Sequence, residues 1–253
     1  MAESKWKIQT ETIELPSRGL IYPLDNPLSS GTIEMKYMGS REEDILTNQN
    51  YIKQGIAIDK LLESLIVSKI NINDMVAGDK NALLIASRIL GYGKEYTFKS
   101  FDSNGKYVDK TIDLTTLEDK ELNPNDLIEE RKNEFQFELP NSGIQIKFRL
   151  LTHGDEKNID KEIEGIKKVF PDKAPPELST RMKYIITSVD GDISTATIRD
   201  FVDNGLLVQD SRALRSEIKR VSPDVHLVYK EEGEVEGTPI PINLNFFWPQ
   251  STI

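Results

Sequence analysis

The tripeptide Glu-Leu-Pro occurs twice in this 253-residue chain, at residues 14–16 and again at residues 138–140. In both places an alternating apolar segment precedes it and a glycine follows within a few residues. Proline lacks the N–H that a sheet ladder needs, and glycine accepts backbone angles that other residues resist. Each Glu-Leu-Pro therefore predicts the end of a strand followed by a turn, so the chain starts the same local structure twice.

Further segments extend the correspondence between the two halves. IEMKYMGSREEDIL from Ile33 places its apolar residues against those of IKFRLLTHGDEKNI from Ile146, and NDMV at 73–76 resembles RDFV at 199–202. Self-similarity of this kind is typical of repeated structural units. An internal duplication predicts two similar lobes related by a pseudo-twofold axis. The alternative is that a common pattern of hairpins and helices recurs by chance.

Periodicity predicts both strands and helices in each half. Alternating residues favour strands, and apolar residues three or four apart favour helices. Asn104-Gly105 between two alternating segments is a strong hairpin signal. The first half predicts strands at 8–15 and 32–38, helices at 41–46, 60–69 and 82–90, and a hairpin of 96–101 with 107–114. The second half predicts a hairpin over 135–151, helices at 154–169, 178–189, 194–202 and 210–221, and a proline-spaced C-terminal strand.

A charged segment separates the two halves. Residues 115–133 read TTLEDKELNPNDLIEERKN, which favours a linker with one short helix at 126–132. A chain of this length suits two domains of modest size. We therefore expect an α+β fold with two lobes, residues 1–114 and residues 134–253, each a β-hairpin with packed helices. The second lobe is expected to end in a terminal aromatic strand.

Composition excludes several classes of protein. No apolar segment approaches the roughly 18 residues of a membrane-spanning helix, and the N-terminus lacks a signal-peptide core. The absence of cysteine excludes disulfides and thiolate metal sites. A net charge of -10 argues against nonspecific nucleic-acid binding. We expect a soluble protein, made inside a cell, whose partners are other proteins.

No group of residues predicts catalysis. His153 and His226 each stand alone, without metal-ligand spacing, and are expected to be solvated or packed. Gly91-Tyr92-Gly93 follows a helix instead of preceding one, so it does not form a phosphate cradle. The segment from Asp102 to Gly105 lacks the later ligands of a calcium loop. We therefore expect no catalytic residue, metal, cofactor or small-molecule substrate.

Two groups of apolar side chains occur in irregular contexts, one in the loop after the first Glu-Leu-Pro and one at the C-terminus. Aromatic and aliphatic anchors of this kind are common at protein–protein interfaces. The competing interpretation is that both groups pack on their own domain. The predicted partner-binding residues are Leu20, Ile21, Tyr22, Phe246, Phe247 and Trp248.

The block ELPSRGLIYPLDNPLSSGTIEMKYMGSREEDILTNQNYIKQG, followed by DKLLESLIVSKI, resembles the baseplate hub proteins of T-even-like contractile-tailed bacteriophages. The resemblance is strongest over Leu15–Val67 and extends to Phe98; the terminal NFFWP is also similar to the aromatic ending of that family. It does not cover the second half from Phe135, whose role stays open.

The resemblance implies a structural or assembly protein of the tail baseplate hub, made in the host cytoplasm and carried in the virion. It implies contacts with other baseplate and tail proteins, with no enzymatic activity and no cofactor. One alternative is an assembly chaperone or regulator that is not retained in the mature virion. Another is a cell-wall hydrolase, for which the sequence offers no acid/base pair.

Overall fold

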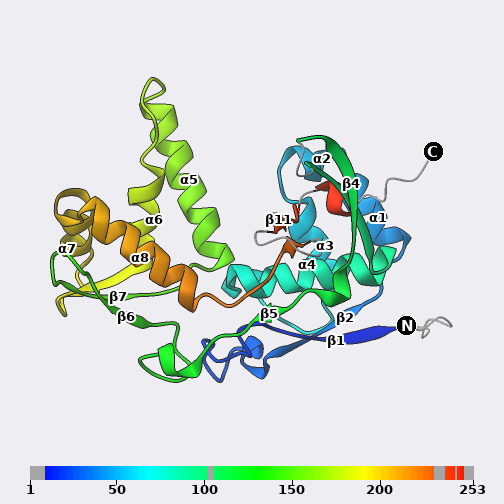
Figure 1. Cartoon of the computed structure of the whole chain (residues 1–253), viewed down its shortest axis with the longest axis horizontal. Coiled ribbons are helices and arrows are strands. Elements are labelled where there is room, and N and C mark those ends of the chain that lie inside the picture. Colours follow the sequence, from blue (N-terminus) through cyan, green and yellow to red (C-terminus); the bar gives the residue numbers. More distant parts are fainter. Residues whose placement is uncertain (1–8, 102–104, 231–236, 243, 248–253) are drawn as a thin grey trace.

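The computed structural model describes residues 9–101, 105–230, 237–242 and 244–247. The fold is α+β, as the sequence predicts, and small sheets and helices form two lobes (Figure 1). Lobe 1 contains the N-terminal half and lies on the right of the figure, and lobe 2 lies on the left. No helix among these residues is both long and apolar enough to cross a membrane.

Lobe 1 begins with an antiparallel hairpin and continues through four helices to a second hairpin. Gly19, with a φ of +72°, forms the turn after Glu-Leu-Pro, where a Cβ would approach the Ser29 carbonyl oxygen to 2.6 Å. Only glycine fits such a close backbone crossing. The elements are β1 (Thr10–Glu14), β2 (Thr32–Lys36), α1 (Ser40–Thr47), α2 (Gln49–Lys53), α3 (Ala57–Leu65), α4 (Ala77–Tyr92), β3 (Glu95–Phe101) and β4 (Tyr107–Asp113).

Lobe 2 has a three-stranded sheet, in the order β6-β7-β8, packed with four helices. The helix predicted over 178–189 ends at Ile185, because Ile186, Thr187 and Val189 are β-branched and favour a strand, in which Ile186 and Val189 pair with β7. The elements are β6 (Phe135–Glu138), β7 (Gln145–Phe148), α5 (His153–Val169), α6 (Glu177–Ile185), β8 (Ile186–Val189), α7 (Thr195–Asp200) with a π-helical turn (Phe201–Gly205), and α8 (Val208–Val221).

The predicted linker packs on lobe 1. β5 (Asp119–Lys120) pairs with β9 (Asp224–Val225), and the Leu122 amide donates to the Pro16 carbonyl. Arg131 donates from its backbone to Leu20 and from its guanidinium to the carbonyl oxygens of Gly19 and Ser29. The helix predicted at 126–132 is absent, since turns replace it after a short 3-10 helix at Pro124–Asp126.

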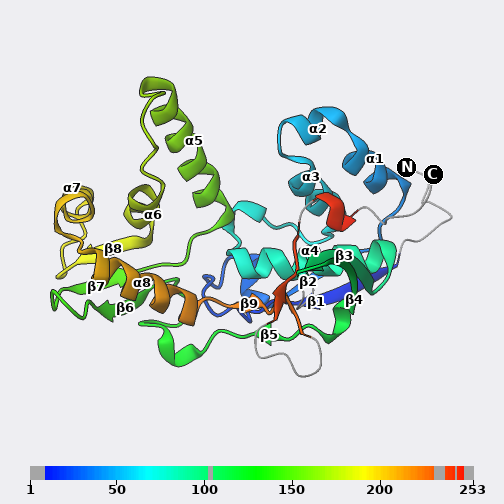
Figure 2. The ribbon, with the colours of Figure 1, turned by 45° about the horizontal axis from the view of Figure 1, so that its top comes forward.

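The chain returns to lobe 1 after α8, so the last residues do not belong to lobe 2 as predicted. β10 (Val228–Tyr229) pairs with β11 (Thr238–Pro239), and the Tyr229 ring lies 5.8 Å from that of Phe98. The predicted terminal strand is instead a 3-10 helix at Leu244–Phe247, which contacts α4 and lies beside α3 in the tilted view (Figure 2). Proline at 239 and 241 limits pairing beyond β11.

The two lobes repeat one set of contacts. The Leu15 amide donates to the Gly31 carbonyl between β1 and β2, and the Leu139 amide donates to the Ile144 carbonyl between β6 and β7. α1 and α5 both begin with a capping box in which an acidic residue, Glu42 or Asp155, bonds the backbone N–H of the N-cap residue. The same two carboxylates form salt bridges with a cation near the end of the preceding hairpin. Glu42 pairs with Lys36 at 2.9 Å, and Asp155 pairs with Arg149 at 2.7 Å.

Each Glu-Leu-Pro turn also bonds the start of a later helix in its own lobe. Ser17 donates its backbone N–H to Asp79 in the first turn of α4, at 2.9 Å. Asn141 donates its backbone N–H to Asp210 in the first turn of α8, at 2.8 Å. These parallels support the predicted duplication; the duplication and its pseudo-twofold axis stay predictions that superposing the two lobes would test.

Candidate functional site

The first predicted anchor group lies mostly inside lobe 1. Ile21 and Tyr22 are buried, and Leu20 is half-buried against the same core. The Tyr22 hydroxyl donates to Asp79 at 2.5 Å and accepts from the Val76 amide at 3.1 Å. Burial beside Asp79 raises the pKa of Tyr22 well above its usual range, so the hydroxyl stays protonated. The expectation of exposed side chains is therefore wrong for Ile21 and Tyr22.

The second predicted anchor group is also turned inward. Phe246 and Phe247 are fully buried, and the Phe246 ring packs edge-on against Tyr96 at 4.8 Å. These aromatic side chains fill the core above β3, where burial of a phenyl ring stabilises the fold more than exposure would. Their burial removes the reason for assigning them to a partner interface. Trp248 lies outside the described residues.

A charged cluster joins the two lobes where α5 begins. Asp59 on α3 accepts from Lys80 on α4 at 2.7 Å, from His153 at 2.9 Å and from Lys157 on α5 at 2.8 Å. The backbone continues the contact, since the His153 amide donates to the Met75 carbonyl at 2.7 Å. We call the lobe 1 surface of Asp59, Met75, Val76 and Lys80 the junction face.

The cluster is suited to holding the lobes together. Burial alone would raise the pKa of Asp59, but hydrogen bonds from His153, Lys157 and Lys80 outweigh it and keep the pKa well below its usual range. The carboxylate therefore stays charged and fixes three cationic or polar groups. Within the described residues, no three His, Cys, Asp or Glu side chains converge as a metal site requires.

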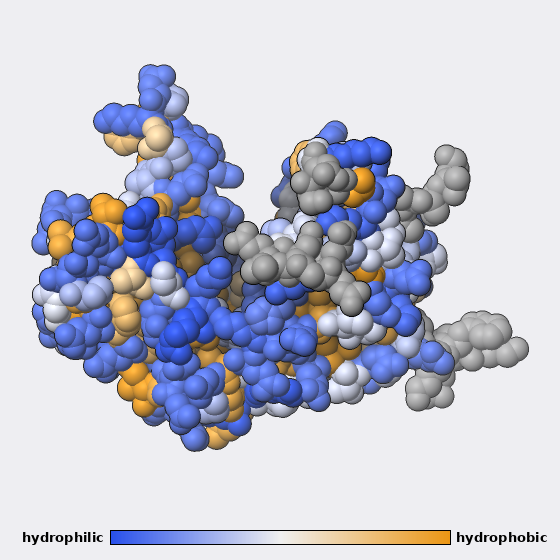
Figure 3. Space-filling view, in the orientation of Figure 1, coloured by the Kyte–Doolittle hydropathy of each residue, from blue (hydrophilic) through white to orange (hydrophobic). Residues whose placement is uncertain are grey.

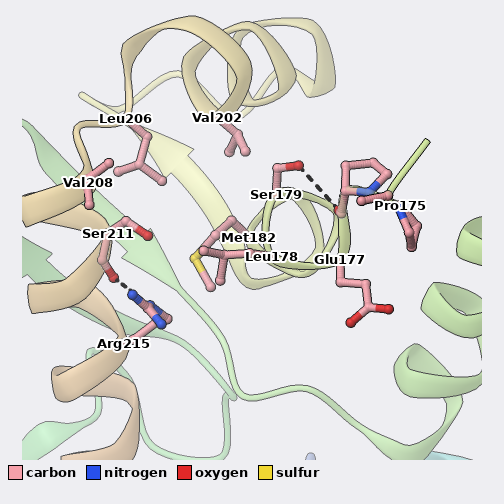
Figure 4. A pocket seen from close by; sticks show the side chains of 12 residues that line it. Pro175, Glu177, Leu178, Ser179, Met182, Val202, Leu206, Val208, Ser211 and Arg215 are labelled. Carbon is pink, nitrogen blue, oxygen red and sulfur yellow. Dashed lines mark hydrogen bonds between the residues drawn. The ribbon is translucent and has the colours of Figure 1, made fainter.

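A groove of about 610 Å³ opens on lobe 2 between α6, the π-helical turn and the start of α8. Apolar side chains from these elements point toward one another across it, with Arg215 at one side (Figure 4). Orange apolar residues also reach the surface of lobe 2 in the space-filling view (Figure 3). The groove is lined by residues that include Leu178, Ser179, Met182, Val202, Leu206, Val208, Ser211 and Arg215.

The groove exposes apolar side chains that a folded lobe normally covers. Val208 is 75% exposed and Leu207 beside it is 53% exposed. Val76, which matches Leu207 at the start of α4, is 2% exposed, whereas Ala77, which matches Val208, is exposed. Contiguous exposed apolar side chains in a groove indicate a surface that binds another molecule.

A larger cleft of about 930 Å³ lies between the lobes, where the end of α8 passes the start of α4. Its charged lining includes Glu156 and Arg181, which pair with each other at 2.6 Å. His226, also in the lining, donates its backbone N–H to Glu118. The arrangement provides no nucleophile with an adjacent base, so the groove on lobe 2 is the better candidate site.

The sequence interpretation missed the groove. The available signal was Leu206-Leu207-Val208, three consecutive apolar residues between a glycine and an aspartate that starts a helix. Such a segment is compatible either with a buried helix start or with an exposed apolar surface. Whether another segment covers these three residues depends on tertiary packing, so the sequence alone does not separate the two cases.

Comparison of the chain with protein-family models, with curated proteins and with solved structures finds no match.

Proposed function

We propose that this chain is a structural or assembly protein of a contractile phage tail baseplate hub, acting through protein–protein contacts without catalysis. The observation that carries the proposal is the open apolar groove on lobe 2, with Val208 three-quarters exposed. A groove with mostly apolar walls and two charged lining residues, Glu177 and Arg215, suits a protein segment as its occupant. The resemblance of Leu15–Phe98 to baseplate hub proteins supplies the biological setting.

The electrostatics support the same conclusion. The chain carries a net charge of -10, which disfavours nucleic acid as the partner. The charged side chains at the lobe junction are paired with one another, as the cluster around Asp59 shows. The exposed surface that most lacks packing neighbours is therefore apolar, which is typical of a protein that binds other proteins.

Single-cysteine cross-linking tests this proposal. The natural chain has no cysteine, so Val208→Cys introduces a unique thiol in the groove. In tails purified from a contractile-tailed phage that encodes this variant, we expect the thiol to cross-link to a baseplate protein. Leu24→Cys on lobe 1 is a matched control, because Leu24 is apolar, is 78% exposed and does not line the groove.

Mass spectrometry of finished tails completes the test. The proposal predicts that the chain is present in tails, and that its loss leaves baseplates unassembled. A chain that is needed for assembly but missing from finished tails is a transient assembly factor. Tails that assemble normally without the chain contradict both roles.

A further inference from the structure

We propose that the groove on lobe 2 binds the N-terminal end of α1 from a second copy of this chain, in a head-to-tail contact. The inference rests on the proposed role of the groove as a protein-contact surface, but not on the phage setting. It identifies the partner from the contacts inside the molecule, since lobe 1 already binds the equivalent helix end of lobe 2.

The groove and the junction face occupy matching places in the two lobes. α3 and α6 each span nine residues and end at Leu65 and Ile185, and the residue after each helix pairs with the preceding hairpin. Asp79 and Asp210 each accept a hydrogen bond from the Glu-Leu-Pro turn of their own lobe, so these two residues align α4 with α8. With these two registers, the lobe 1 residues Asp59, Met75, Val76 and Lys80 correspond to Ser179, Leu206, Leu207 and Ser211. Three of these four counterparts line the groove.

The junction face is covered by the first turn of α5. Thr152 forms a β-bridge with Val76, and the His153 side chain reaches Asp59. Gly154 lies so near lobe 1 that a Cβ there would stand 3.0 Å from the Asn73 carbonyl oxygen. The helix end is thus seated closely on lobe 1 by backbone and side-chain contacts.

α1 is the lobe 1 counterpart of α5, and its first turn is uncovered. The matching capping boxes place Gly39 and Ser40 where lobe 2 has Thr152 and His153. Gly39, Ser40 and Arg41 are all exposed. The molecule therefore has one uncovered helix end on lobe 1 and one open groove on lobe 2. These two surfaces are the counterparts of the α5 helix end and the junction face, which contact each other inside the molecule.

Charge and size at the two surfaces agree with this pairing. At the junction face, Asp59 faces the cationic side chain of Lys157. The groove is lined by Glu177 and Arg215, and the position in α1 that matches Lys157 is Asp44, which can pair with Arg215. Ser179 and Ser211 replace the larger Asp59 and Lys80, so the approaching helix end meets neutral small side chains and an apolar wall.

The contact is heterologous, since it joins two different surfaces. A pair of bound copies still offers one free helix end and one free groove, so copies add in a ring or an open chain. This property separates the proposal from a symmetric dimer and determines the experiment.

Sedimentation of the purified chain, alone and in mixtures of variants, tests the proposal. Val208→Asp places a charge in the groove, and Asp44→Arg places a cation opposite Arg215. Both positions are exposed, so each variant should keep the melting temperature of the natural chain. We expect the natural chain to exceed the mass of one copy in concentrated solution. Each variant alone should associate at least roughly tenfold more weakly, because a charge is buried without a partner.

The mixture of the two variants is the decisive sample. The intact helix end of Val208→Asp fits the intact groove of Asp44→Arg, so the mixture should form a complex of one copy of each and no larger species. A natural chain that stays at the mass of one copy overturns the proposal. So do variants that associate as strongly as the natural chain, or a mixture in which no complex forms. Presence of the chain in purified tails is a separate result, so failure here leaves the proposed function intact.

Discussion

Lobe 1 and lobe 2 share their hairpin and helix contacts but differ in what covers them. The first turn of α5 covers the junction face of lobe 1, and the returning C-terminal segment covers β3 and α4. On lobe 2, the surface that matches the junction face is the groove. The same local arrangement is therefore covered by other parts of the chain in lobe 1, whereas the matching surface of lobe 2 stays open.

The two helix-start aspartates show a second difference. Burial raises the pKa of Asp79, which accepts from Ser17 and Tyr22 inside the core. Burial alone would also raise the pKa of Asp210, but donors on Asn141 and Ser142 outweigh it and lower the pKa. Both carboxylates are buried, but lobe 1 also buries the donors Ser17 and Tyr22, whereas Asn141 and Ser142 are exposed, and the two pKa shifts are opposite.

The largest expected effect tests the covering of lobe 1. Phe247→Ala should lower the free energy of unfolding by about 3–5 kcal/mol, because it removes a fully buried ring and leaves a cavity. Val208→Ala on the uncovered face of lobe 2 should change it by less than about 0.5 kcal/mol. Urea unfolding of both variants measures this. Equal effects at the two positions contradict the difference in covering.

Removing the enclosed aspartate should come next. Asp79→Ala leaves the Tyr22 hydroxyl and the Ser17 donors buried without an acceptor, which costs about 2–3 kcal/mol. Asp210→Ala should cost less, since water can reach its donors more readily. Unfolding midpoints of the two variants at one pH compare them. A larger loss at Asp210 counts against the deeper burial of the donors to Asp79.

A substitution at the lobe junction should lower the free energy of unfolding by a smaller amount. Asp59→Ala leaves Lys80, His153 and Lys157 without their shared carboxylate, and we expect a loss of about 2 kcal/mol. Ser179→Ala, at the matching place in the groove, should change the stability by less than about 0.5 kcal/mol. Thermal unfolding of each variant is sufficient. A loss at Ser179 as large as that at Asp59 would show that the groove is already filled.

The smallest effect is a pH dependence at the junction. The pKa of Asp59 is lowered in the folded chain, so its contribution is fully present above the pKa of an unfolded aspartate, near 4. That contribution is lost as the pH falls from there toward the folded pKa. The stability difference between the natural chain and Asp59→Asn should therefore shrink in acid. A difference that grows in acid would mean that the folded pKa is raised.

Much of the fold could be predicted from local signals. Both Glu-Leu-Pro turns, the Asn104-Gly105 hairpin signal and the helical spacing before Leu65 correspond to elements of the structure, because turn chemistry and periodicity act over a few residues. The α+β class follows from these signals together.

The candidate site could not be predicted in the same way. Ile21, Tyr22 and Phe247 were expected at a partner interface, because loops and chain ends are usually solvent-exposed. Their burial depends on long-range contacts, such as Tyr22 with Asp79, that no local pattern records. Val208 is the converse case, since it is an apolar residue at a helix start that no other described segment covers.

Hydrogen exchange at the two matching surfaces is the most direct test of the central claim. Amides of Met75, Val76 and Lys80 on lobe 1 should exchange slowly at every protein concentration, because they are hydrogen-bonded and α5 covers these residues within one chain. Amides of residues 204–211 on lobe 2 should exchange fast in dilute solution and slowly in concentrated solution, as second copies fill the groove. Exchange at 204–211 that does not change with concentration, or that is as slow as at Met75, Val76 and Lys80 in dilute solution, would contradict the account.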